Sequence, residues 1–254
     1  MGAIAIALIV FACVFGGALL GMLLRRTLPA HHLADESKDV MKLGMGLVAT
    51  MAALVLGLLI ASAKSSYEAQ RTGFEQVAAN LIMLDNTLAR FGPEASATRA
   101  QLRRTVAAAL ARIWPEEGAP ATGLAAKETT AAGGSLLELV LALSPHDEAQ
   151  RWLQSQALQI GAELARTRWL LFEEQQGASI PTPFLAVLVF WLAVLFGSFG
   201  LFSRPNATII ATLLVCALSV SGAVFLVLEM DRPFSGMVKI SSAPLRGALA
   251  QLDR

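Results

Sequence analysis

The fold is decided by a stretch without charge, residues 43–63, which reads LGMGLVATMAALVLGLLIASA. Three other stretches share its character, at residues 3–24, 184–202 and 207–228, and each has about the 20 residues that a helix needs to cross the hydrocarbon core of a bilayer. All 20 basic and 19 acidic residues lie outside these four windows. A buried helix of a soluble protein has a shorter apolar run, so the sequence predicts four transmembrane helices.

The composition excludes several classes of function. Only 15% of the residues are charged and 55% are hydrophobic, whereas a soluble domain carries about 25% charged residues. The formal net charge of +1 leaves no basic surface for nucleic acid, and two cysteines are too few for a disulfide framework or a thiolate metal cage. We therefore expect the lipid bilayer as a partner, no nucleic-acid partner and no cofactor.

The order of the spans predicts the architecture. Residues 1–63 form a first transmembrane hairpin, and residues 184–228 form a second hairpin with a very short link. The polar residues 64–183 between them form a helical extramembrane domain, and residues 229–254 are a C-terminal tail. The expected fold is an all-α membrane protein with four transmembrane helices in two hairpins and an intervening helical bundle.

A heptad pattern runs through the start of the polar region. Apolar residues recur at steps of three and four, and Gly92-Pro93 then ends the helix. The same register extends backward into the second span, which predicts one unbroken helix from the membrane into the helical domain. We expect this heptad seam to hold subunits together. Its members are Phe74, Val77, Leu81, Leu84, Leu88 and Phe91.

Proline and capping signals predict the remaining helices. One covers residues 93–115, a capping box at residues 135–138 starts another, and a third covers residues 145–172. The third offers two tryptophans, Trp152 and Trp169, for packing. The polar region is thus predicted to be a compact antiparallel helical bundle.

No motif in the sequence supports an enzyme. A nucleophile elbow, a phosphate-binding loop and a zinc-protease helix are all missing, and no ionisable residue lies within the spans to couple transport to protons or sodium. His31 and His32 are adjacent, so on a helix they point in different directions, and two histidines rarely complete a metal site. They are weak metal candidates, and we favour a solvated interfacial loop.

The second span carries a ridge of small residues, which recur about every four positions and so line one face of a helix. Two interpretations remain open, because such a ridge either lets another helix pack closely or, repeated around an axis, lines a narrow pore. Gly17 and Gly21 in the first span form a further close-packing motif. The members of the small-residue ridge are Ala49, Ala53, Gly57 and Ala61, which recur every four residues, and Gly46 and Thr50, which flank them.

Polar clusters end two of the spans. A lysine beside hydroxyls at a pore mouth would concentrate anions, although an interfacial anchor with a snorkelling lysine is the commoner arrangement. This cluster, at the end of the second span, is Ser62, Lys64 and Ser65. At the end of the fourth span we expect a local ion pair that sets how the tail leaves the membrane, in preference to a gate. That cluster is Glu229, Asp231 and Arg232.

Several motifs in the chain resemble one family. They are LPAHH at residues 28–32, GMG at residues 44–46, ALVLGLLIASAK at residues 53–64, FGPE at residues 91–94, FGLF at residues 199–202 and LEMDRPFSG at residues 228–236. With these motifs the chain resembles the bacterial bestrophin-like membrane protein family. The resemblance implies kinship with bestrophins, which are pentameric chloride channels with four-helix subunits and a helical cytosolic region.

From these observations we expect a homo-oligomer that conducts anions passively in the bacterial inner membrane, with Thr50, the small-residue ridge and Lys64 along the path. The alternative is a non-conducting structural or signalling membrane protein whose helical domain recruits a partner. Basic residues around the first loop favour a cytoplasmic loop by the positive-inside rule. The resemblance favours a cytoplasmic helical domain, which is the orientation that we adopt.

Overall fold

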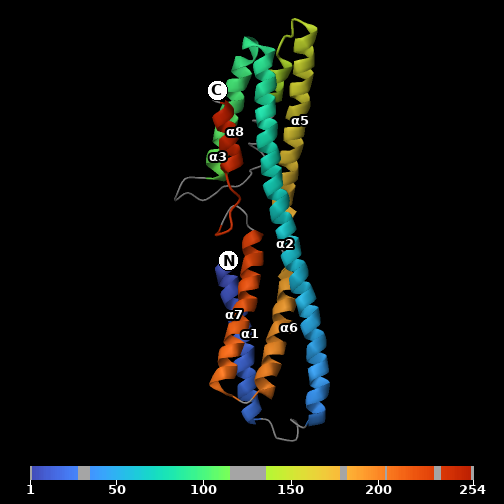
Figure 1. The fold of residues 1–254 in the computed structure, drawn as a ribbon, viewed down its shortest axis with the longest axis vertical. Coiled ribbons are helices and arrows are strands. Elements are labelled where there is room, and N and C mark those ends of the chain that lie inside the picture. Colours follow the sequence, from blue (N-terminus) through green and yellow to red (C-terminus); the bar gives the residue numbers. More distant parts are fainter. Residues whose placement is uncertain are drawn as a thin grey trace. The chain divides into compact units, whose positions relative to one another are not determined.

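The computed structural model describes residues 2–27, 35–114, 136–177, 182–203, 205–231 and 236–252. Every regular element in these ranges is a helix, in agreement with the predicted all-α fold (Figure 1). A short helical segment covers residues 136–141. The other elements are α1 (Ala3–Thr27), α2 (Asp35–Phe91), the 3₁₀ helix η2 (Pro93–Ala95), α3 (Ser96–Ile113), α5 (Glu148–Gly177), α6 (Thr182–Phe202), α7 (Ala207–Met230) and α8 (Ala243–Leu252).

Four of these helices are long and apolar enough to cross a membrane: α1, the part of α2 from Met41 onward, α6 and α7. Each of them contains one of the four predicted spans. A helix is the natural form for such a segment, because it satisfies its own backbone hydrogen bonds where no water is available.

The second of these helices is unusually long. α2 continues unbroken from Asp35 to Phe91, which confirms the predicted long helix. It ends where the sequence predicts, because Gly92 has a φ of 125°, a conformation that residues with a side chain rarely adopt. Pro93 follows and begins the 3₁₀ turn that leads into α3.

The chain divides into two compact units. The membrane unit comprises Met1–Ser65 and Ser179–Asp231, and the helical unit comprises Ser66–Ala178 and Arg232–Arg254. α2 contributes its first part to the membrane unit and its remainder to the helical unit.

Within the membrane unit, α1 packs against both α6 and α7 (Figure 1). The core consists mainly of aliphatic side chains from these helices, with Ala52 of α2 added, and Val14, Leu188 and Ala217 are completely enclosed.

The crossing of α1 and α6 depends on glycine. A Cβ atom on Gly17 would lie 2.7 Å from the carbonyl oxygen of Ala193, and a Cβ atom on Gly21 would lie 2.8 Å from the carbonyl carbon of Gly197. Real Cβ atoms essentially never come so close to another atom, so the two backbones leave no room for a side chain. The close-packing motif predicted at Gly17 and Gly21 is therefore confirmed.

The helical unit is built around the heptad seam of α2. All six seam residues are buried in one core, together with Leu102 of α3, Leu164 of α5 and Ala248 of α8. The seam thus packs inside the chain's own bundle. The expectation that it holds subunits together is wrong, because a face covered by the chain's own helices cannot also contact another copy.

Polar contacts connect the elements of the helical unit. Arg99 of α3 binds Asp85 of α2 with two hydrogen bonds, from Nε to Oδ1 at 2.7 Å and from the terminal nitrogen to Oδ2 at 2.8 Å. The indole Nε1 of Trp114 donates to the carbonyl oxygen of Ile240 at 2.8 Å, which ties the C-terminal segment to the bundle. Trp152 and Trp169 are 64% and 53% exposed, so neither belongs to this core.

Candidate functional site

The membrane-spanning part of α2 has only one face in the membrane-unit core. Ala52 is buried, and Val48, Val55 and Leu59 pack partly against the same core. Val55 also lines an apolar groove with Trp191 and three neighbouring residues at the start of α6. Val55 of α2 therefore lies beside the start of α6, and the described residues of the chain cover little of the other faces of this part of α2.

The small-residue ridge lies on an open face of α2. Ala49 is half-buried at the edge of the packed face, and the other five members are exposed. A Cβ atom added to Gly46 or Gly57 would meet nothing within 4 Å, in contrast to Gly17 and Gly21. Among the described residues nothing packs on the two glycines of the ridge, and of its members only Ala49 contacts the core. The ridge is therefore open to a second copy or to a pathway.

Thr50 supplies the hydroxyl group on this ridge. Its Oγ1 donates a hydrogen bond to the carbonyl oxygen of Leu47 at 2.8 Å, so the helix's own backbone uses the hydroxyl proton. The hydroxyl would have to rotate away from that carbonyl before it could donate to an anion. Thr50 can accept a hydrogen bond without this change.

The cluster at the end of the second span is accessible. Ser62, Lys64 and Ser65 are all exposed. The next residue, Ser66, donates from Oγ to Oε1 of Glu174 at 3.4 Å, a contact between α2 and α5 within the helical unit. The sequence did not indicate this contact, because the two residues are 108 positions apart.

The cluster at the end of the fourth span is only partly described. Glu229 is buried, and Asp231 is half-buried and caps α7 through its backbone N–H, which donates to the carbonyl oxygen of Val227 at 3.2 Å. Arg232 lies outside the described residues, and so do His31 and His32. In the part of the chain that the structure describes, no group of three or more histidine, cysteine or acidic residues is placed to hold a metal ion.

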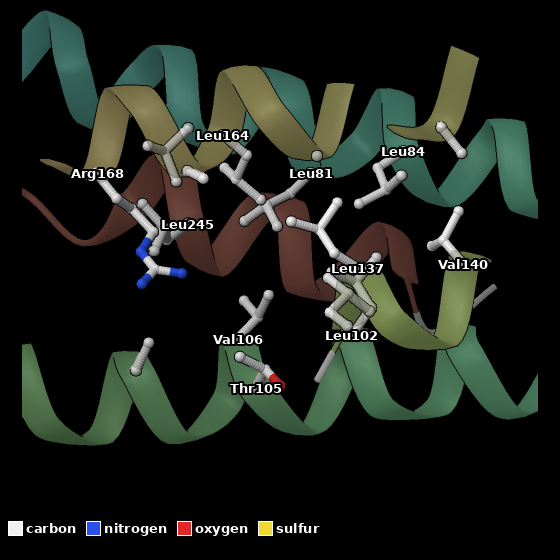
Figure 2. A pocket seen from close by; sticks show the side chains of 16 residues that line it. Leu81, Leu84, Leu102, Thr105, Val106, Leu137, Val140, Leu164, Arg168 and Leu245 are labelled. Carbon is white, nitrogen blue, oxygen red and sulfur yellow. The ribbon is translucent and has the colours of Figure 1, made fainter. Parts of the chain in front are cut away.

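A cavity of about 90 Å³ lies in the helical unit and was not predicted (Figure 2). Its lining is apolar except for Thr105 and Arg168. Burial lowers the pKa of Arg168 from its ordinary value. A sequence signal for this site exists, since Arg168 follows Ile160 and Leu164 on the buried stripe of α5, where an apolar residue is expected.

A family model described as the Bestrophin-like domain matches residues 12–245. The chain belongs to the Bestrophin-like family. The match begins within α1 and ends within α8, so it covers both units, and it confirms the resemblance seen in the sequence motifs. No curated protein and no solved structure matches the chain. Together with the four apolar helices, the family identifies a membrane protein.

Proposed function

We propose that this Bestrophin-like protein assembles as a homo-oligomer of five copies and forms a passive pathway for anions. In this proposal the four spans form two hairpins in the bacterial inner membrane, and the helical unit lies on the cytoplasmic side. The small-residue ridge of each α2 faces the central axis. The observation that carries the proposal is the exposure of that ridge on a helix whose opposite face is packed.

The surface of α2 has one strip of side chains that suits contact with lipid and another strip that suits a pathway. At about 100° per residue, three strips follow one another around the helix. The packed strip contains Ala52, a second strip contains the large exposed side chains of Leu47, Leu54 and Leu58, and the third is the small-residue ridge. Large aliphatic side chains suit lipid. Small side chains instead leave space, which a neighbouring helix or a conducted ion would occupy.

The length and chemistry of the ridge fit a narrow passive path. From Gly46 to Ala61 the helix rises about 22 Å, most of the roughly 30 Å of hydrocarbon. The four predicted spans contain no acidic residue, lysine, arginine or histidine, which is consistent with diffusion down a gradient. Lys64 and the two serines beside it would raise the anion concentration at one end of the path.

The test is Ala53→Trp, because Ala53 lies in the middle of the ridge and its side chain is exposed. We expect this variant to remove anion current in planar bilayers while the oligomer, measured by size exclusion with light scattering, persists. The matched control is Leu218→Trp, a mid-span residue of α7 that is 63% exposed, which should conduct normally. Full current from an assembled Ala53→Trp protein would remove the ridge from the pathway.

A second candidate function is a non-conducting structural or signalling protein whose helical unit recruits a soluble partner. Its support is the exposure of large apolar side chains on that unit, with Trp152 at 64% and Leu141 at 62%. Such side chains are typical of protein contacts when they gather into a patch. A stable monomer in detergent that carries no current would favour this alternative.

A further inference from the structure

The cavity in the helical unit is enclosed by elements from distant parts of the sequence. Leu81 of α2, Val106 of α3, Leu164 of α5 and Leu245 of α8 all line it, and the segment 136–141 contributes Val140 and its neighbours (Figure 2). Water is unfavourable in such a space, because an apolar cavity offers too few hydrogen-bond partners and remains dry or takes an apolar guest.

Among the described residues that line the cavity, one side chain carries a charge. Arg168 extends from α5 so that its guanidinium lies at one end of the cavity (Figure 2), and its Nε atom is buried. Thr105, the other polar lining residue, already donates its hydroxyl proton to the carbonyl oxygen of Gln101 at 2.9 Å. Among the described lining residues, Arg168 is therefore the group whose charge can attract an anionic guest.

We propose that this cavity binds a small amphiphilic carboxylate, with its hydrocarbon tail among the aliphatic side chains and its carboxylate beside Arg168. A guanidinium is planar and remains protonated, so it matches the two oxygens of a carboxylate. The desolvation that lowers the pKa of Arg168 also strengthens attraction to an anion placed there.

The size of the cavity sets the length of the tail. The cavity of about 90 Å³ is smaller than the apolar cavity of about 150 Å³ that takes up benzene, so its guest has a tail smaller than benzene. Acids with short chains, of the size of butanoate, therefore fit, and longer chains have to extend beyond the apolar lining. The proposal is separate from conduction, because the site lies wholly in the helical unit.

The experiment is a saturation-transfer NMR titration of the full-length protein in phosphatidylcholine nanodiscs, with empty nanodiscs as background. The probes are acetate, propanoate, butanoate and hexanoate, with butanol as the neutral analogue. We expect saturable binding that tightens about fourfold for each methylene up to butanoate and then levels off. Binding without saturation, or an affinity independent of chain length, would overturn the proposal.

Substitutions test separately how much the charge of Arg168 and the apolar space of the cavity contribute to binding. Arg168→Gln should weaken butanoate binding about tenfold and leave butanol binding unchanged, and Arg168→Lys should recover part of the loss. The matched control is Arg166→Gln, two residues away and exposed, which should bind like the parent. Ala157→Leu places extra carbons in the cavity and should abolish binding of both probes. Equal butanoate affinity in Arg168→Gln and Arg166→Gln would refute the assigned role of Arg168, even if Ala157→Leu fails to fold.

Discussion

Replacing Gly21 with alanine is expected to separate α1 from α6. The added Cβ atom would lie 2.8 Å from the carbonyl carbon of Gly197 and 2.9 Å from the backbone nitrogen of Leu201, whereas ordinary van der Waals contact begins at 3.4 Å. Both obstacles are backbone atoms of α6, so no side chain can rotate to make room. The two helices must move apart along their whole contact.

The expected cost follows from that geometry. Overpacking of a close contact costs about 1–3 kcal/mol, and a rigid backbone obstacle places Gly21→Ala at the upper end. Alanine returns about 1 kcal/mol, because it is a better helix former than glycine. The net loss of stability is about 2 kcal/mol, or about thirtyfold in the folding equilibrium.

Thermal unfolding in detergent, followed by tryptophan fluorescence, measures this loss. The matched control is Gly16→Ala on the same helix, where a Cβ atom meets nothing within 4 Å and the alanine should be neutral or stabilising. We expect Gly21→Ala to unfold well below both the parent and Gly16→Ala. If the two variants have the same midpoint, the close α1–α6 crossing is not the geometry of the protein.

Three further substitutions test the helical unit, two of them by thermal unfolding and one by hydrogen exchange. Asp85→Ala leaves Arg99 without its bidentate partner, and because that arginine side chain is 32% exposed the expected loss is about 2 kcal/mol, less than for a fully buried pair. A double-mutant cycle with Arg99→Ala should show coupling, and additive effects would contradict it. Trp114→Phe removes the hydrogen bond to the C-terminal segment and should cost about 1 kcal/mol, checked by faster hydrogen exchange in α8. Gln154→Met removes an amide that donates to carbonyl groups of residues 140–143, and a loss of less than about 0.5 kcal/mol would show those bonds to be unimportant.

Several features of the fold were accessible to sequence reasoning because they depend on local physics. The four spans follow from hydrocarbon-length stretches without charge, and the end of α2 follows from Gly92 and the proline after it. The glycine crossing was indicated by Gly17 and Gly21, since only residues without side chains permit such an approach.

Other features depend on which surfaces meet, and periodicity alone does not reveal that. The heptad seam is equally compatible with a contact between subunits and with a contact inside one bundle, and the structure shows the second. The pairing of Asp85 with Arg99 joins two helices across a turn, so no pattern within either helix predicts it.

The sequence alone determined that this chain has four helices long and apolar enough to cross a membrane, because no charge interrupts these segments and a helix satisfies its own backbone where water is absent. Tertiary structure decided which helix faces are covered. It places Ala52 of α2 against the core and leaves the small-residue ridge open, and it brings Arg168 to the end of an apolar cavity. The reason is that a side chain is buried only where two surfaces meet. Which surfaces meet depends on how all the helices pack together.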